Sequence, residues 1–540
     1  MSAPATPASP HRTLALTLDV ALFAAAIAVL HRVLAQYRYA DFVAAMHALG
    51  IRAVLQSLLV SLLGYAALVG YDFLSLRLVG RPLSVRRMWL PSFISFAVAN
   101  SAPLAILTGS GLRYRLFSGL GLTPGQTARV TAANVLTYLL GLLTIAGAAF
   151  LLVPVRPLGG ITLAGRSMQL VGALFLILVA ILFGLSARHR HALRLWRWRV
   201  ELPSTLVLLR QLLVASADWL LSSAALYVLL RAAGSFAYPR FLTTFLFAQI
   251  VTQVVPLPGG LGVFETVMLL LRPPGPPVPL MAAALLLYRV TYYLIPLATA
   301  GVALVWRATP APAAGAAPGP LEEVASFLAP HILAVLTFLS GIELLLFGAL
   351  PADPSRLAWL GRLLPLAVIE GSHFLGSIVG TGLVFLAWGL ERRIRGAWRL
   401  TLLLVSLGIP AALMRAGDVP SAGILLLLAL VLVAARHVFD RLTPLGSEPL
   451  DAAWSVAALL ALGTVALLAL FAHWQVQYAD SLWWQFAIDS DAPRALRMIV
   501  GAVGTGVLFA LGRLVTLARR RSDGGDGSHR PGASAASTPR

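Results

Sequence analysis

Residues 51–77, IRAVLQSLLVSLLGYAALVGYDFLSLR, decide the fold class of this chain. Between Arg52 and Arg77 the one charged residue is Asp72, and the apolar residues do not alternate with polar ones. A run of about 20 apolar residues is long enough to cross a bilayer as a helix. The lack of a two-residue period argues against a barrel strand. The stretch therefore predicts a transmembrane helix that carries a carboxylate.

Comparable apolar runs recur along the 540-residue chain, which is 59% hydrophobic and only 11% charged. Globular domains are nearer 25% charged. We therefore predict an all-α polytopic membrane protein with about 14 hydrophobic segments. The expected segments are 13–34, 51–77, 89–107, 123–153, 167–185, 203–231, 240–256, 278–306, 323–350, 357–390, 397–414, 421–439, 452–474 and 495–518.

The net charge of +20 comes from 41 basic residues, all arginine, that gather in short loops between apolar runs. Cytoplasmic loops that face anionic lipid have this distribution, so we expect no nucleic-acid partner. The absence of lysine and cysteine excludes phosphate-loop, Schiff-base and thiol chemistry. The chain has no catalytic or dinucleotide motif, so we expect no catalytic residues, no cofactor and no metal.

A Pro/Ala/Gly-rich stretch divides the chain into two parts. Its composition is that of a linker. We expect a transmembrane domain at 1–308, a linker at 309–322, a six-segment domain at 323–518 and a basic, disordered tail at 519–540. The distribution of arginines in the loops predicts a multi-pass protein of the bacterial inner membrane with both termini cytoplasmic.

Two segments are predicted to be re-entrant hairpins. The basic loops 77–87 and 186–200 should both be cytoplasmic, so an even number of crossings must separate them. A re-entrant hairpin at about 89–122 makes the number of crossings even. Residues 240–271 are predicted to form a second re-entrant hairpin. Proline and glycine would break the helix in each. The expected hairpin backbone residues are Gly109, Gly111, Pro258, Gly259 and Gly260.

The two hairpin regions resemble each other. Tyr71–Leu74 (YDFL) resembles Ala217–Leu220 (ADWL), and Ser110–Tyr114 (SGLRY) resembles Gly259–Val263 (GGLGV). In the predicted topology the two copies run in opposite directions through the membrane. Weak internal similarity with broken segments at matching positions is typical of inverted-repeat transporters.

Five charged residues fall in or beside these repeats: Asp72, Arg113, Arg115, Asp218 and Glu265. Charges inside membrane segments are costly and usually functional. A lipid head group with a phosphate and an ammonium would need arginines for the first and carboxylates for the second. Each also has a purely structural alternative. Asp72 pairs with Arg77, the two arginines lie at the surface and set topology, Asp218 is a structural core residue, and Glu265 caps the Pro-Gly turn.

Polar residues also occur in the second half. Glu343, Glu370 and His373 lie in apolar context, but two ligands on one helix face do not make a metal site. The stretch His473–Trp484 has the composition of an interfacial aromatic belt.

Several motifs together resemble the membrane half of the bacterial multiple peptide resistance factor family, the bifunctional lysylphosphatidylglycerol synthase/flippases. They span about residues 15–518. The matching stretches are Gly70–Asp72, Gly109–Arg115, Pro258–Glu265, Ser372–Ser377, Leu482–Ala487 and Asp491–Arg494. The resemblance implies an eight-segment flippase part and a six-segment part that supports a soluble aminoacyltransferase. The family's functional charges map to Asp72 and Arg113.

The resemblance implies translocation of aminoacylated phosphatidylglycerol or a related anionic phospholipid, with resistance to cationic peptides as the outcome. The sequence ends soon after Arg521, where the transferase would begin, so we expect no synthesis by this chain. The resemblance also implies a homodimer. Three alternatives remain: an anchor for a separately encoded aminoacyl-lipid synthase, the membrane half of such a synthase, and a transporter of small solutes.

Overall fold

The computed structural model describes residues 37, 39–101, 105–153, 165–188, 193–195, 198–200, 203–231, 236–254, 262–272, 275–308, 320–349, 362, 364–415 and 418–443, and parts of 454–466 and 499–511. These residues form two compact units. Unit 1 comprises Met1–Ala303 with Gly315–Val324, and unit 2 comprises Leu304–Ala314 with Ala325–Arg540.

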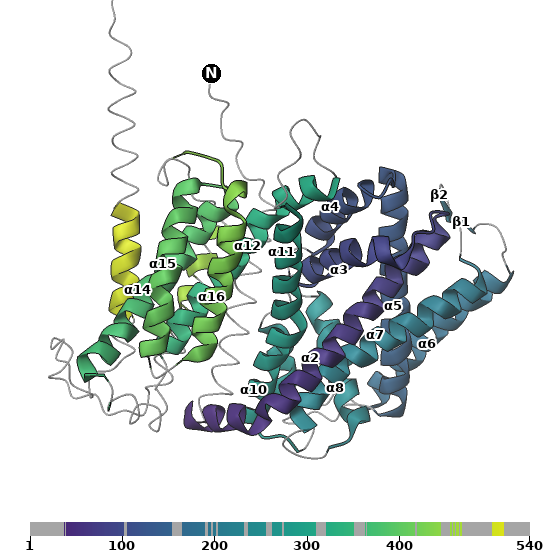
Figure 1. Cartoon of the computed structure of the whole chain (residues 1–540). Coiled ribbons are helices and arrows are strands. Elements are labelled where there is room, and N and C mark those ends of the chain that lie inside the picture. The colour runs from purple at the N-terminus through teal and green to yellow at the C-terminus, as the bar shows by residue number, and fades with distance from the viewer. Residues whose placement is uncertain are drawn as a thin grey trace, which may run out of the picture. The chain divides into compact units, whose positions relative to one another are not determined.

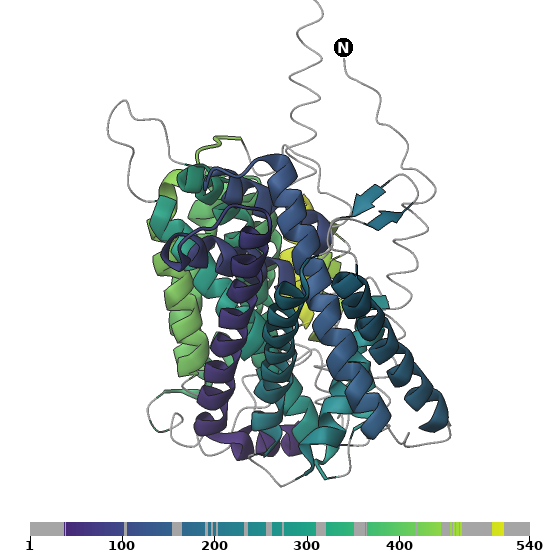
Figure 2. The ribbon, with the colours of Figure 1, turned by 90° about the vertical axis from the view of Figure 1, so that its right-hand side faces the viewer.

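The described part of the chain is helical except for one short hairpin of two strands, so the predicted all-α membrane fold is confirmed. The elements before the second unit are α2 (Tyr39–Leu78), α3 (Val85–Ser101), α4 (Ala105–Ser118), α5 (Pro124–Leu152), α6 (Gly165–Arg188), β1 (Leu193–Leu195), β2 (Trp198–Val200), α7 (Thr205–Arg231), α8 (Tyr238–Val254), α9 (Val263–Leu270), α10 (Val278–Tyr288), η2 (Arg289–Leu294) and α11 (Ile295–Ala308). Figures 1 and 2 show the long helices of unit 1 side by side, with β1 and β2 at one end.

Eight of the described helices are long and apolar enough to cross a membrane: Ala44–Leu78, Pro124–Leu152, Arg166–Arg188, Thr205–Arg231, Val278–Trp306, Ser326–Leu346, Gly371–Glu391 and Arg395–Met414. Each overlaps a predicted segment. The first predicted segment, 13–34, lies outside the described residues, and the total of 14 stays a prediction.

Local sequence explains where the long helices begin and bend. Thr123 caps α5 by accepting from the backbone N–H of Gln126, whose side chain in turn accepts from the N–H of Thr123. This reciprocal pair is a capping box, and Pro124 fits the first turn because no hydrogen bond needs its nitrogen. Helix α2 bends at Gly50, which has φ +63°, a conformation that suits glycine.

Two pairs of short helices lie where the sequence predicts hairpins. Helices α3 and α4 have 17 and 14 residues and pack against each other. Helices α8 and α9 have 17 and 8 residues and also pack together. None reaches the roughly 20 residues that a complete crossing needs. In Figure 1, α3 and α4 lie in the upper half of unit 1 and α8 lies in the lower half.

The expected position of the first break is partly wrong. Helix α3 ends at Ser101 as expected, but Gly109 and Gly111 lie inside the continuous helix α4. Glycine costs a helix only about 1 kcal/mol relative to alanine, and glycines are frequent in membrane helices. The connections 102–104 and 255–261, which include Pro258, Gly259 and Gly260, lie outside the described residues.

The span Val278–Trp306 is interrupted in its middle by the π-helical segment η2. Such segments are rare and occur frequently at functional sites. Here the segment begins at Arg289, the one charged residue between Val278 and Trp306.

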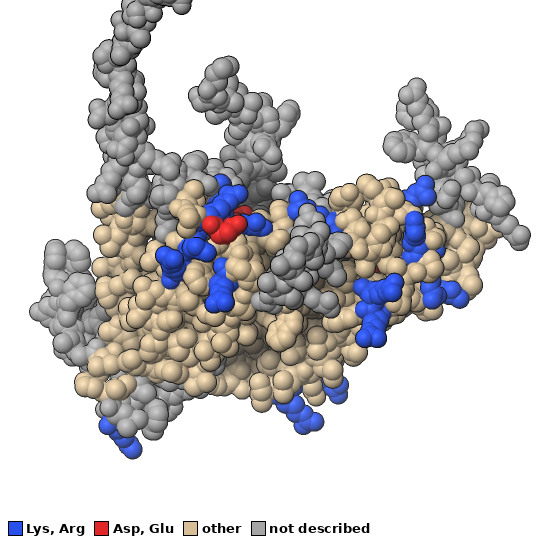
Figure 3. Space-filling view, turned by 45° about the horizontal axis from the view of Figure 1, so that its top comes forward, with Lys and Arg blue, Asp and Glu red and all other residues tan. Residues whose placement is uncertain are grey.

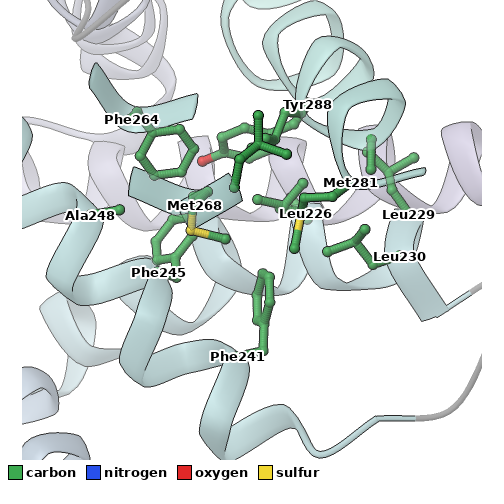
Figure 4. Packing of buried hydrophobic residues seen from close by; sticks show 14 of the residues in the cluster. Leu226, Leu229, Leu230, Phe241, Phe245, Ala248, Phe264, Met268, Met281 and Tyr288 are labelled. Atoms are coloured by element: carbon green, nitrogen blue, oxygen red, sulfur yellow. The ribbon is translucent and has the colours of Figure 1, made fainter. Parts of the chain in front are cut away.

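Helices α5 and α7 approach closely at Gly141. A Cβ atom placed there would lie 2.5 Å from the Cβ of Ala215 and 2.8 Å from its carbonyl carbon. Small residues at such crossings let membrane helices pack backbone to backbone. The core beside this crossing is rich in aromatic rings, and Figure 4 shows Phe241, Phe245, Phe264 and Tyr288 packed together with Met268.

Unit 2 contains α12 (Pro320–Ala349), α14 (Leu366–Glu391), α15 (Arg395–Met414), α16 (Val419–Ala434) and η3 (Arg436–Val438). Helices α14, α15 and α16 pack in sequence order. Helix α12 meets α14 at Gly341, where an added Cβ would lie 2.6 Å from the carbonyl oxygen of Gly380.

The described surface exposes many large apolar side chains. Leucine, isoleucine and valine side chains on α2, α6, α7, α15 and α16 are exposed. In the view of Figure 3 the arginines gather toward one end of the helices, with few at the opposite edge and almost none between. This distribution is that of a protein whose middle lies in lipid.

Candidate functional site

A buried ion pair joins the first hairpin to the long helix α2. The guanidinium of Arg113 on α4 donates to Oδ1 of Asp72, and the two side chains are 7% and 0% exposed. The side-chain nitrogen of Asn134 on α5 donates to the same oxygen at 2.6 Å. The Oγ of Ser75 donates to Oδ1 of Asn134 at 2.7 Å and so orients the amide. Three helices therefore converge on one carboxylate.

Aromatic rings surround the guanidinium of Arg113. Its Cζ lies 4.6 Å from the ring centre of Phe96 and 5.7 Å from that of Phe117. Stacking of this kind is worth about 0.5–2 kcal/mol when the cation is desolvated. The carboxylate oxygen Oδ2 of Asp72 has no hydrogen-bond partner among the described residues. The pair thus holds one unused acceptor beside a fixed cation.

A second ion pair joins the second hairpin to the π-helical segment. The Nε of Arg289 donates to Oε1 of Glu265 at 2.7 Å. The other carboxylate oxygen accepts from the backbone N–H of Gly262 at 2.8 Å. Glu265 therefore caps α9 and also binds a cation. The Cζ of Arg289 lies 4.8 Å from the ring centre of Tyr293 and 5.7 Å from that of Phe264.

The two ion pairs have the same construction with the charges exchanged. In the first, the short helix supplies the arginine and the long span supplies the carboxylate. In the second, the short helix supplies the carboxylate and the span supplies the arginine. Each guanidinium stacks on two rings. Each pair therefore places a cation and a carboxylate side by side in the interior of unit 1.

Asp218 has different surroundings. It lies on α7 at 5% exposure, and its Oδ2 accepts from the hydroxyl of Tyr71 at 2.9 Å. No arginine or histidine in the described part of the chain pairs with it. Since Tyr71 precedes Asp72 on α2, the same helical turn contacts Asp218 and Arg113 on different sides.

Hydroxyl groups fill the space between α2, α7 and the interrupted span. The hydroxyl of Tyr65 donates to the carbonyl oxygen of Tyr292 at 3.2 Å, and that of Tyr288 lies 3.0 Å from Ser222 Oγ. Ser57 and Thr291 are joined at 3.0 Å. The interior of unit 1 therefore contains hydrogen bonds between hydroxyl groups, and from a hydroxyl to a carbonyl, in addition to its apolar packing.

The outcome for the predicted site residues is mixed. Asp72 pairs with Arg113 and not with Arg77, whose guanidinium stacks on Phe73 at 4.1 Å. Arg115 is exposed and takes no part in the buried pair. For Glu265, the structure shows the capping contact of the structural alternative through one oxygen and an ion pair with Arg289 through the other, and binding of a head group stays a prediction.

Sequence reasoning missed Arg289 and Asn134. Arg289 carried a detectable signal, because a charge in the middle of an apolar run is a functional candidate by default. Asn134 carried none, since its contact with Asp72 depends on how α5 packs against α2.

Unit 2 contains its own polar cluster. Arg415 donates to Asp418 at 2.7 Å, and Ser421 donates to Asp418 at 2.6 Å and also to Glu343. Arg415 further donates to the carbonyl oxygen of Leu344 at 3.0 Å. His373 is buried on α14, whereas the side chain of Glu370 and the stretch His473–Trp484 lie outside the described residues. No group of three metal-ligating side chains occurs among the residues that the structure describes.

The fold and the site define a multi-pass α-helical membrane protein with buried charge pairs in its first unit. The chain matches the family described as "Lysylphosphatidylglycerol synthase TM region" over residues 16–300, more than half of its length. It therefore belongs to this family. The matched range covers most of unit 1 and includes both ion pairs and Asp218, whereas the expected likeness over about 15–518 extends beyond it.

Two curated proteins are similar to the chain. "Uncharacterized protein slr0712" of Synechocystis is 31% identical over 287 residues, which cover 53% of this chain and 89% of that protein. "Inner membrane protein YbhN" of Escherichia coli is 33% identical over 230 residues, which cover 42% of this chain and 71% of that protein. The two relatives support membership of this membrane family, and neither name states a reaction.

Proposed function

We propose that this protein translocates a phospholipid whose head group carries both a phosphate and an ammonium, such as aminoacylated phosphatidylglycerol, across the bacterial inner membrane. The observation that carries the proposal is the matched construction of the Asp72–Arg113 and Glu265–Arg289 pairs. The family description and the inner-membrane relative support the lipid class and the location.

The chemistry of exchange favours a head group with both charges. A phosphate that binds Arg113 displaces Asp72 and leaves a buried carboxylate without a cation. An unpaired buried charge is strongly unfavourable, by several kcal/mol. If the same head group brings an ammonium, that group takes the place of the guanidinium beside Asp72, and no charge stays unpaired. Unmodified phosphatidylglycerol lacks the ammonium and should move more slowly.

The two hairpins supply the access route in this proposal. In Figure 1, α3 and α4 of the first hairpin lie toward one end of unit 1 and α8 of the second lies toward the other, an arrangement that favours copies with opposite orientation. A head group would meet one pair from each side of the membrane while its acyl chains stay in lipid. Cytoplasmic termini, a dimer and resistance to cationic peptides through a less negative outer surface belong to the same proposal.

The test is lipid translocation in proteoliposomes. Lysyl-, alanyl- and unmodified phosphatidylglycerol are loaded in one leaflet, and their appearance in the other is followed with and without an ion gradient. Asp72→Asn, Arg113→Ala and Glu265→Gln should each slow the aminoacyl lipids at least tenfold. Arg77→Ala, an exposed arginine on the same helix as Asp72, is the matched control and should be near wild type. If no lipid moves in any condition, the proposal is wrong.

A second candidate is an anchor or the membrane half of an aminoacyl-lipid synthase. The family description favours it, because it names the transmembrane region of a synthase. In that case the protein would bind a separate aminoacyltransferase or belong to a longer chain. Co-purification of a transferase, with no lipid movement by the membrane part alone, would support this candidate over the transporter.

A further inference from the structure

Among the described residues of unit 1, three carboxylates lie in the interior, and two of them are neutralised. Asp72 pairs with Arg113, and Glu265 pairs with Arg289. Asp218 is equally deep, yet among the described residues it has no ion pair, and its Oδ1 is buried without any hydrogen-bond partner. One hydroxyl, that of Tyr71, is its single polar contact. An ionised carboxylate in such a place would be an uncompensated charge.

The helices packed against α7 supply no compensating cation for Asp218 among the described residues. The titratable side chains that interact electrostatically with Asp218 are Tyr65 and Tyr71 from α2, Tyr138 from α5, Tyr288 from α10 and Tyr292 from η2. The charged and histidine side chains of these elements, of α7 itself and of α6 and α8 form no ion pair with Asp218. They are Asp41, His47, Arg52, Asp72, Arg77, Arg129, Arg166, Arg188, Arg210, Arg231, Arg240 and Arg289.

In the described part of the chain, the carboxyl of Asp218 therefore has a neutral hydroxyl as its hydrogen-bond partner and no cation as an ion-pair partner. Tyrosine hydroxyls can donate hydrogen bonds but do not supply positive charge. A buried carboxyl without a cation is neutral in preference to ionised, because burial in a low-dielectric interior disfavours the charged form. Carboxyl groups of this kind are the proton carriers of membrane pumps and transporters.

We infer that Asp218 is the proton-binding group of this transporter: it carries a proton on Oδ1 when the site is empty and releases it when the ammonium of a lipid head group moves on to it from Asp72, which then pairs with Arg113 again. The inference rests on the proposed function and adds its energy source, exchange of one proton for one amine. The step balances, since the O–H bond of the carboxyl breaks, the proton leaves to water, and the carboxylate pairs with the incoming ammonium.

Infrared spectroscopy tests the protonation directly, without lipid transport. The full-length protein in nanodiscs at neutral pH should show a carbonyl band of a protonated carboxyl that Asp218→Asn lacks. Glu265→Gln should keep this band, because an ion-paired carboxylate does not contribute to it. Tyr71→Phe, which removes the hydrogen bond to Oδ2, should move the band to higher frequency. If the wild-type and Asp218→Asn spectra are alike in this region, the inference is overturned.

The second measurement adds lysyl-phosphatidylglycerol to the same nanodiscs. The band should decrease and protons should appear in the medium in about equal amount to the bound lipid. In proteoliposomes, a pH gradient should change the rate of lipid movement for the wild type by tenfold or more and for Asp218→Asn by less than twofold. Lipid movement that ignores the gradient in the wild type would overturn the inference and leave the proposed function standing. A band that persists with lipid bound would also overturn it.

Discussion

Tyr71 and Asp72, adjacent on α2, hold two separate polar sites of the first unit: the hydroxyl of Tyr71 donates to Asp218, and the carboxylate of Asp72 accepts from Arg113. Neighbouring residues on a helix point about 100° apart, so one turn of α2 can contact α7 on one side and α4 on the other. A small rotation of α2 about its axis would therefore alter both contacts together. This coupling is the structural reason to test the two sites in the same experiments.

The first prediction concerns the Asp72–Arg113 pair. Asp72→Asn or Arg113→Gln alone leaves one buried charge without its partner, which costs about 3–5 kcal/mol. The double variant Asp72→Asn/Arg113→Gln removes both charges and should regain more than half of the lost stability while staying inactive in transport. Thermal unfolding in detergent measures the first effect and the proteoliposome assay the second. A double variant whose stability equals the sum of the single losses would contradict the pairing.

The second prediction separates the two roles of Glu265. Glu265→Gln keeps a side-chain acceptor for the Gly262 N–H but loses the attraction to Arg289, whereas Glu265→Ala loses both. The alanine variant should therefore be less stable by a further 0.5–2 kcal/mol, about the value of a helix cap. Both variants should be equally slow in lipid transport. A difference in transport as large as the difference in stability would argue that the cap, and not the charge, matters.

The third prediction compares two arginines of α4. Arg113 is buried against Asp72, and Arg115 is exposed. Arg113→Ala should abolish most transport, and Arg115→Ala should change it less than twofold. The purified variants are compared at equal protein-to-lipid ratio. An equal loss in both would restore Arg115 to the head-group site that the sequence suggested.

The fourth prediction tests the crossing of α5 and α7. Gly141→Leu places a side chain where even a Cβ would lie 2.5 Å from Ala215, so the two helices must separate and the protein should fail to fold. Gly184→Leu on α6 is the control, since no atom lies within 4 Å of its added Cβ. Monodisperse elution in size-exclusion chromatography distinguishes the two. Normal behaviour of Gly141→Leu would show that this contact is not needed.

Much of the fold could be predicted because membrane helices depend mainly on local composition. Spans such as Thr205–Arg231 follow directly from length and apolarity. The continuity of α4 through Gly109 could not be predicted, because glycine weakens a helix too little to end it when packing supports it. The sequence marks the interruption at η2 only indirectly, through Pro296 two residues after it, because proline has no N–H to donate to the carbonyl of Tyr292.

The candidate site could be predicted as a set of charges but not as pairs. The cost of a charge in the membrane draws attention to Asp72, Arg113, Asp218 and Glu265. That Asp72 meets Arg113 and not Arg77 depends on α4 packing close to the end of α2, which no spacing rule supplies. The isolation of Asp218 is likewise a property of its neighbours, which are tyrosines from three other helices.

The π-helical segment η2 gives the span Val278–Trp306 a joint that a regular helix lacks. A π turn holds one residue more than an α turn. Converting η2 to α geometry would turn α11 relative to α10 by roughly 100° about their common axis, the rotation of one residue. Arg289 lies at the start of η2. Replacing its carboxylate partner by a head group and converting η2 to α geometry would therefore occur in one movement. Binding of a head group at the second hairpin would thereby rotate α11, the far half of the span.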